Sequence, residues 1–143
     1  MDECKLCQEG DFEKYLISED QYWKVYLNPN QAYLGRGLIK LKRHSEDLFD
    51  IDSNEQQELF DFGTRYRNAV NELFTPDMFN YVSAGNRMPH LHIHIVPRYS
   101  SEREFHGITF NDNKWTDTYD PSEKMDLSED IIKNILESIK SRF

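Results

Sequence analysis

The sequence predicts an α+β domain with a small antiparallel sheet, one long helix packed on that sheet, and a further helix at the C-terminus. Two observations support the sheet: short runs rich in aromatic and β-branched residues, and turn residues or short connections between them. A third supports the helices, because two longer stretches repeat apolar residues at helical spacing.

Four strands are expected. Residues 22–27 form the first, ended by the Asn-Pro-Asn turn, and residues 38–41 form the second. Residues 78–83 form the third, and the fourth begins at His90 and is closed by Pro97. The short connection between the third and fourth strands predicts an antiparallel pair.

The long helix is expected from about Asn54 to Phe74, with Asp52 or Ser53 as its cap. Its apolar stripe is formed by Leu59, Phe60, Phe62, Tyr66, Val70, Leu73 and Phe74. A final helix, about 128–141, starts at Ser128 and has acidic residues in its first turn. Residues 100–127 are polar and irregular, so they either wrap the body or cover a pocket.

Composition restricts the protein class. The length of 143 residues is typical of one domain, here 1–143, and 38% hydrophobic residues can bury a core. No apolar run approaches the roughly 20 residues of a membrane span, and the N-terminus lacks the pattern of a secretion signal, so we expect a cytoplasmic protein. A net charge of −9 without a basic stripe argues against binding a nucleic-acid polymer. The basic run 40–44 could still serve one small anion.

The most informative segment is His-Leu-His-Ile-His-Ile-Val-Pro-Arg at residues 90–98. Because side chains alternate along a strand, the three histidines should share one face and the aliphatic residues between them the other. Imidazole can act as nucleophile, acid, base or metal ligand near neutral pH. A structural array and a pure metal site are the alternatives; the flanking residues favour catalysis.

Cys4 and Cys7 form a Cys-x-x-Cys close to the N-terminus. Without a secretion signal a structural disulfide is not expected. Half of a zinc site is the favoured interpretation, with His44 and His90 as candidate partners. A metal-free pair and a redox site are the alternatives.

The histidine segment, followed by Pro97 and Arg98, resembles the signature of the histidine triad superfamily of nucleotidyl hydrolases and transferases. Residues 35–44 resemble that family's Gly-His-x-Leu-Val-x-Pro-Lys-Arg-His segment, and Ala84-Gly85-Asn86 resembles its Ala-Gly-Gln. The likeness covers about residues 4–99, leaving 100–143 as an extension. It implies the fold of that superfamily and, through a dinucleoside-tetraphosphate hydrolase-like branch, a dinucleoside polyphosphate as the favoured substrate.

The resemblance implies nucleotidyl transfer in two steps, in which neutral His92 attacks the α-phosphorus and a covalent nucleotidyl-histidine forms. It also implies further roles: His94 and Asn86 donate to the phosphate, His90 orients His92, Asn80 holds the phosphate side and Asn28 the ribose. Arg98 is either structural or steers an anion.

Two positions depart from the family pattern. Arg36 replaces a histidine; it cannot be an acid or base near neutral pH but can bind phosphate. Asn86 replaces a longer glutamine or a serine. These departures keep a second function open, a zinc-stabilised nucleotide-binding module with little catalysis. A relative of the hexose-1-phosphate nucleotidyltransferases is a weaker third.

The resemblance further implies zinc held by Cys4, Cys7, His44 and His90, and a homodimer. A closed Cys2His2 set suits a structural zinc.

Overall fold

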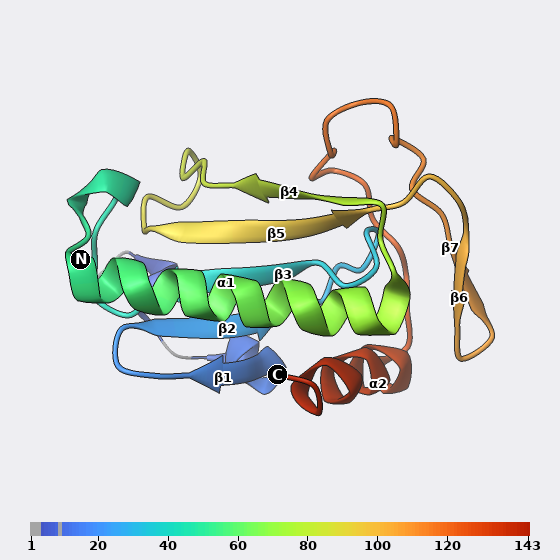
Figure 1. The fold of residues 1–143 in the computed structure, drawn as a ribbon, viewed down its shortest axis with the longest axis horizontal. Coiled ribbons are helices and arrows are strands. Elements are labelled where there is room, and N and C mark those ends of the chain that lie inside the picture. The colour runs from blue at the N-terminus through green and yellow to red at the C-terminus, as the bar shows by residue number, and fades with distance from the viewer. Residues whose placement is uncertain (1–3, 9) are drawn as a thin grey trace.

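The computed structural model describes residues 4–8 and 10–143. Its centre is a five-stranded antiparallel sheet with the strand order β1-β2-β3-β5-β4 (Figure 1). The strands are β1 (Leu16–Glu19), β2 (Trp23–Leu27), β3 (Gly37–Leu41), β4 (Met78–Val82) and β5 (His92–Arg98). The predicted α+β class is therefore confirmed, and so is the antiparallel pairing of β4 with β5.

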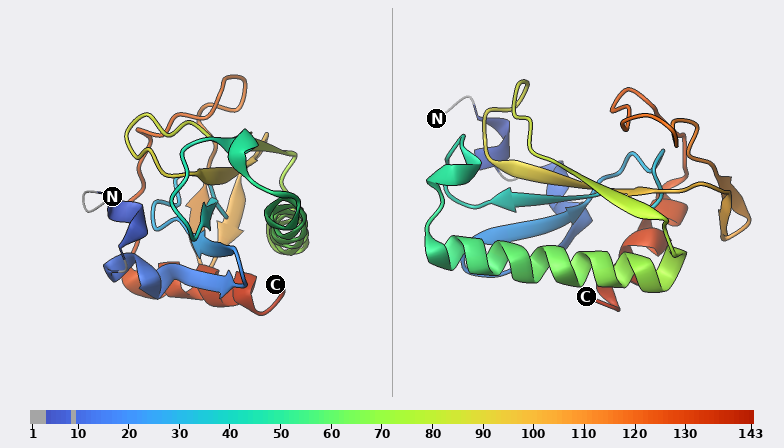
Figure 2. Two further views of the ribbon diagram at one scale, coloured as in Figure 1. Left: turned by 90° about the vertical axis from the view of Figure 1, so that its left-hand side faces the viewer. Right: turned by 45° about the horizontal axis from the view of Figure 1, so that its top comes forward.

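Helix α1 (Ser53–Phe74) runs along one face of the sheet, and the N-terminal segment lies on the opposite face (Figures 1 and 2). Asp52 caps α1 in a full capping box with Glu55, as one of the two predicted caps. The helix buries Phe62, Tyr66 and Val70 of the predicted stripe but leaves Phe60 75% exposed. The stripe is therefore narrower than the sequence suggested.

Helix α2 (Glu129–Lys140) is capped by Ser128, whose hydroxyl accepts a hydrogen bond from the backbone of Ile131. Its buried face consists of Ile132, Ile135, Leu136 and Ile139. It packs near β1 and one side of α1, closing the core at the edge of the sheet (Figure 1).

The structure corrects three expectations. Strand β1 was not predicted, because Leu-Ile-Ser-Glu is short and carries little strand signal by itself. The segment expected to be irregular contains a small hairpin, β6 (Arg103–Phe105) and β7 (Ile108–Phe110). Pro97 does not close β5 but lies within it, opposite Phe79 of β4.

Pro97 is tolerated there because the pairing of β3 with β5 extends only from Ile95 to His92. Beyond Ile95, β5 is paired with β4 but no longer with β3. Because proline has no backbone N–H group, it is tolerated where the strand has no hydrogen-bonding neighbour on one side. Short 3-10 helices at Lys5–Cys7, Asp11–Tyr15 and Leu48–Asp50 complete the described part of the fold. No helix within the described ranges is long and apolar enough to cross a membrane.

Gly37 allows α1 to approach the sheet closely. A Cβ atom at this position would lie 2.3 Å from the hydroxyl oxygen of Tyr66. Tyr66 is fully buried, and its hydroxyl donates a 2.7 Å hydrogen bond to the carbonyl oxygen of Gly35, so the ring cannot move aside freely. The contact shows that Gly37 faces α1, so the neighbouring side chain of Leu38 faces away from the helix.

We expect Gly37→Ala to lower the free energy of unfolding by about 1–3 kcal/mol through this overpacking. The matched control is Gly63→Ala within α1, where an added Cβ meets nothing within 4 Å. That change should stabilise the helix by about 1 kcal/mol. Urea denaturation measures the free energy of unfolding of both variants. An equal change in the two variants would contradict the close approach of α1 to Gly37.

Candidate functional site

The two faces of β5 carry different chemistry, as predicted, but the strand begins at His92, so His90 lies just before it and not within it as expected. Leu91 and Ile95 belong to the hydrophobic core and Ile93 packs against it. His92 and His94 lie on the face that points away from α1, with their ring centroids 5.0 Å apart and their planes nearly perpendicular. The N-terminal segment lies on this side of the sheet, opposite α1 (Figure 2).

The His92 ring is held by the backbone just before β5. It is 8% exposed, and its Nδ1–H group donates a 2.6 Å hydrogen bond to the backbone carbonyl of His90. This bond assigns the proton of a neutral ring to Nδ1. The lone pair is then on Nε2, the nitrogen that a nucleophilic histidine would use.

His94 lies opposite Leu38 of β3 and is partly buried. Its Nδ1 atom is buried and has no hydrogen-bond partner among the described residues. Burial lowers the pKa of His94 to about 4, and the positive charge of Arg36 adds to this effect. The ring is therefore neutral at physiological pH, with one N–H donor and one acceptor nitrogen.

Four predicted metal ligands meet at the end of the sheet beyond His92. The ligand atoms of Cys4, Cys7, His44 and His90 all lie within 4.8 Å of one another. The Nδ1 atom of His90 is 3.4 Å from Cys4 Sγ, 3.2 Å from Cys7 Sγ and 3.2 Å from His44 Nδ1. With Zn–S bonds of about 2.3 Å and Zn–N bonds of about 2.0 Å, a tetrahedral zinc places its ligand atoms about 3.3–3.8 Å apart.

The hydrogen bonds of His90 also suit a metal. Its Nε2–H group donates to the carbonyl oxygen of Leu41 at 2.7 Å, which leaves the lone pair on Nδ1, toward the cysteines. Burial lowers the pKa of His90 and so favours the neutral ring that a metal requires. The cluster can bind a metal ion, and the donor set fits zinc.

Arg98 is enclosed by protein acceptors. It is 2% exposed, and its Nε and Nη2 groups donate to both carboxylate oxygens of Asp112, at 2.7 and 3.2 Å. The remaining N–H groups are taken by the Asn80 side chain and by the carbonyls of Asp117 and Lys114. With all five donors engaged, this geometry favours the structural one of the two roles that the sequence left open.

The other predicted site residues are more scattered. Asn28 directly follows β2, and its Oδ1 accepts a hydrogen bond from the backbone N–H of Asn30. Asn80 is partly buried on β4 and accepts the hydrogen bond from Arg98 described above. Asn86 is exposed in the connection between β4 and β5. Arg36 precedes β3 and is 5% exposed, on the same side of the sheet as His94.

Three residues near this face were not among the predicted site residues. Lys40, directly opposite His92, donates to the carbonyl of Leu6 and so ties the N-terminal segment to β3. Asp112 carries the ion pair with Arg98, and the Tyr119 ring centroid lies 5.4 Å from the guanidinium carbon of Arg36. Tyr119 was visible only as one of several aromatic residues in a polar segment, which carries no positional signal.

A family model supports a relationship that the motifs suggested. The model of the HIT domain matches residues 9–101. The protein hit of Bacillus subtilis is 25% identical over 140 residues, which cover 94% of each chain. The asymmetrical bis(5′-nucleosyl)-tetraphosphatase of Schizosaccharomyces pombe is 21% identical over 111 residues, which cover 71% of this chain and 61% of that protein.

Solved structures have the same fold. A histidine triad protein from Bradyrhizobium japonicum superposes with a TM-score of 0.71 at 17% identity, covering 94% of this chain and 96% of that one. A zinc-bound histidine triad family protein from Mycobacterium smegmatis superposes with a TM-score of 0.60 at 20% identity, covering 89% and 84%. At these identities the similarity establishes the fold alone.

Proposed function

The chain belongs to the HIT domain family, and from this premise we propose that it is a nucleotidyl hydrolase or transferase that cleaves at the α-phosphate of a nucleoside polyphosphate. The observation that carries the proposal is the hydrogen bond from His92 Nδ1 to the His90 carbonyl. It leaves an imidazole with a lone pair on Nε2 in the middle of the histidine row. A ring so placed is suited to attack phosphorus.

The reaction takes two steps. In the first, Nε2 of His92 bonds to the α-phosphorus while the bond from phosphorus to the bridging oxygen breaks, and the leaving phosphate departs. In the second, water attacks the phosphorus, the N–P bond breaks, and a nucleoside monophosphate and a proton are released. A neutral nucleophile is not repelled by the phosphate charge, and the covalent intermediate divides one hard step into two easier ones.

The neighbouring residues have matching roles. Neutral His94 donates from a ring nitrogen to a phosphate oxygen, and Asn86 donates from the connection between β4 and β5. Asn28, at the end of β2, holds the ribose, and Asn80 supports the phosphate side through its bond to Arg98. Positioning and electrostatic stabilisation supply most of the rate in such reactions.

A dinucleoside polyphosphate is the favoured substrate class. This choice is supported by the similarity to the bis(5′-nucleosyl)-tetraphosphatase of Schizosaccharomyces pombe. It is also supported by the general resemblance of the sequence to the dinucleoside-tetraphosphate hydrolase-like branch of the family. Nucleoside phosphoramidates and aminoacyl-adenylates present the same α-phosphorus and belong in the same test panel.

We expect His92→Asn to keep the fold and to lower turnover of the best panel substrate at least about 1,000-fold, because the nucleophile is gone. Product formation is measured by mass spectrometry and the melting temperature by circular dichroism. His106→Ala is the matched control, because His106 lies in the β6–β7 turn and should be dispensable.

Unchanged turnover in the His92 variant would disprove this role. A parent protein that binds a nucleoside monophosphate in calorimetry but turns over no panel substrate would instead favour the second function, a zinc-stabilised nucleotide-binding module.

We further propose that the metal of the Cys2His2 cluster is zinc. The zinc-bound relative from Mycobacterium smegmatis and the spacing of the four ligand atoms support this. Bound there, zinc supplies structural cross-linking and no reactive group, since all four positions are filled by protein. It would join the N-terminal segment to the residue whose carbonyl orients His92.

Protein prepared without chelator should contain about one zinc per chain, as expected for a closed structural site. Cys7→Ser should lower the zinc content and the melting temperature, whereas His106→Ala should change neither. Elemental analysis and thermal denaturation provide the readouts. A metal-free protein whose melting temperature does not respond to added zinc would exclude this proposal.

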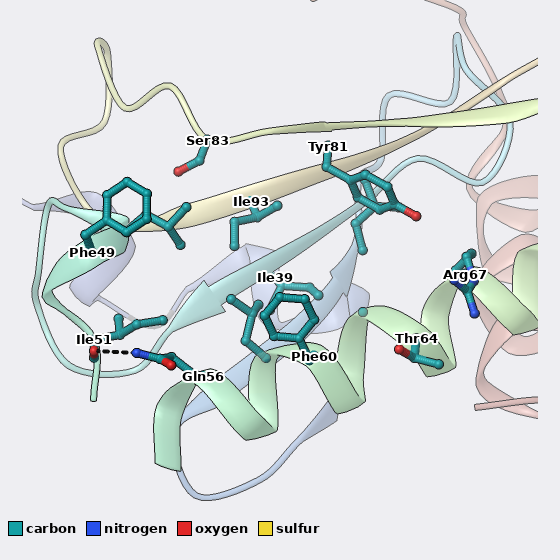
Figure 3. A pocket seen from close by; sticks show the side chains of 14 residues that line it. Ile39, Phe49, Ile51, Gln56, Phe60, Thr64, Arg67, Tyr81, Ser83 and Ile93 are labelled. Atoms are coloured by element: carbon teal, nitrogen blue, oxygen red, sulfur yellow. Dashed lines mark hydrogen bonds between the residues drawn. The ribbon is translucent and has the colours of Figure 1, made fainter. Parts of the chain in front are cut away.

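We also propose that the chain forms a homodimer through β4 and the adjoining groove. Strand β4 is an edge of the sheet, without a charged residue or proline along its five residues. Beside it, a groove of about 640 Å³ separates α1 from β4 and β5. The groove is lined by three exposed aromatic residues, Phe49, Phe60 and Tyr81, which are 92%, 75% and 54% exposed to solvent. Their rings lie on different walls of the groove (Figure 3).

Two copies related by a two-fold axis could pair their β4 edges antiparallel and bury these rings. The mass in solution should therefore be twice the 17.1 kDa of one chain. Tyr81→Lys should shift the protein to monomer, while Gln57→Lys, on α1 outside the groove, should not. Sedimentation equilibrium tests this, and a monomeric parent at micromolar concentration would refute it.

A further inference from the structure

Arg36 is a buried cation without an anionic partner. It is 5% exposed, and within residues 4–8 and 10–143 no carboxylate forms an ion pair with its guanidinium. Its Nε–H group is buried without any hydrogen-bond acceptor in the same part of the chain. The Tyr119 side chain is hydrogen-bonded to the guanidinium but does not balance its charge. Burying a charge is costly unless it is both paired and hydrogen-bonded, so this arrangement indicates an anionic ligand.

The backbone fixes the direction of this side chain. The Cβ direction of Gly37 points at Tyr66 of α1, so the neighbouring residues Arg36 and Leu38 face the opposite side of the sheet. Leu38 lies directly opposite His94. Arg36 is therefore one step along the same face from His94, whose Nδ1 atom also lacks a partner.

Tyr119 covers the guanidinium from the segment that follows β7. The Tyr119 ring centroid is 5.4 Å from the Arg36 Cζ atom. The same ring packs edge-on against the Tyr33 ring, with the two centroids 5.8 Å apart. This segment is firmly attached to the sheet, because Arg98 binds Asp112 and the Tyr33 hydroxyl accepts from the backbone of Asp120. Tyr119 thus lies over Arg36 in a defined position, although it falls outside the matched residues 9–101.

We infer that Arg36, His94 and Tyr119 form a subsite for one oxyanion of the bound nucleotide phosphate, in which Arg36 and Tyr119 are specificity-determining residues. The inference rests on the proposed function, since it places a nucleotide phosphate beside His92. Arg36 supplies the permanent charge and donors suited to phosphate, and neutral His94 supplies a hydrogen bond. Tyr119 shields both from water, which strengthens their attraction for the anion.

The test compares the affinity of a 5′-monophosphate with that of its nucleoside. Calorimetry measures adenosine, guanosine, AMP and GMP on the parent and on Arg36→Gln, Arg36→Lys and Tyr119→Phe. Arg36→Gln should lower the monophosphate-to-nucleoside affinity ratio about 10- to 100-fold, because a charge-assisted hydrogen bond is lost. Arg36→Lys should retain part of this affinity ratio. Tyr119→Phe should lower the ratio several-fold, because it removes the hydroxyl that is hydrogen-bonded to Arg36.

Nucleoside affinity and melting temperature should stay close to the parent values in all variants, and Arg142→Gln, an exposed arginine near the C-terminus, is the matched control. A parent-like ratio in Arg36→Gln would overturn the inference while leaving the proposed function standing. An equal loss of nucleoside and monophosphate affinity would also overturn it, in favour of a structural role. A parent that binds none of the four ligands would defeat the proposed function and the inference together.

Discussion

One hydrogen bond determines what this site can do, because it decides which nitrogen of His92 is free. The donor is Nδ1 of His92 and the acceptor is a carbonyl two residues earlier in the same chain. A backbone acceptor cannot rotate away as a side chain can, so the ring orientation is built into the strand. The remainder of the fold serves to keep that short piece of backbone in place.

Three parts of the molecule contribute to this support. Helix α1 packs on the face of the sheet opposite the histidines. Leu91 and Ile95 are buried in the core on that side, so His92 and His94 face away from the helix. Cys4, Cys7 and His44 surround the imidazole of His90, the residue whose carbonyl holds His92. The segment after β7, attached through Arg98, covers the far end of the same face. The candidate site is thus held at both ends, by residues that do not touch the proposed reacting atoms.

The sequence predicted the features that depend on short-range pattern. Period-two alternation located the histidine face, and the candidate caps Asp52 and Ser53 located the start of α1. The four cluster residues came together as the family resemblance implied. Strand β1 and the place of Pro97 within β5 were missed, because both are decided by pairing with distant strands. The contacts of Arg36 with Tyr119 and of Arg98 with Asp112 could not be foreseen either, since each joins the sheet to a segment without periodicity.

The central claim is that phosphorus becomes covalently bonded to one ring nitrogen. Its most direct test is intact-protein mass spectrometry after rapid mixing with a dinucleoside polyphosphate, followed by an alkaline quench that preserves a nitrogen–phosphorus bond. The account predicts a transient mass increase of one nucleotidyl group, located on the peptide that contains His92. Turnover without any adduct, or an adduct on a different residue, would contradict it.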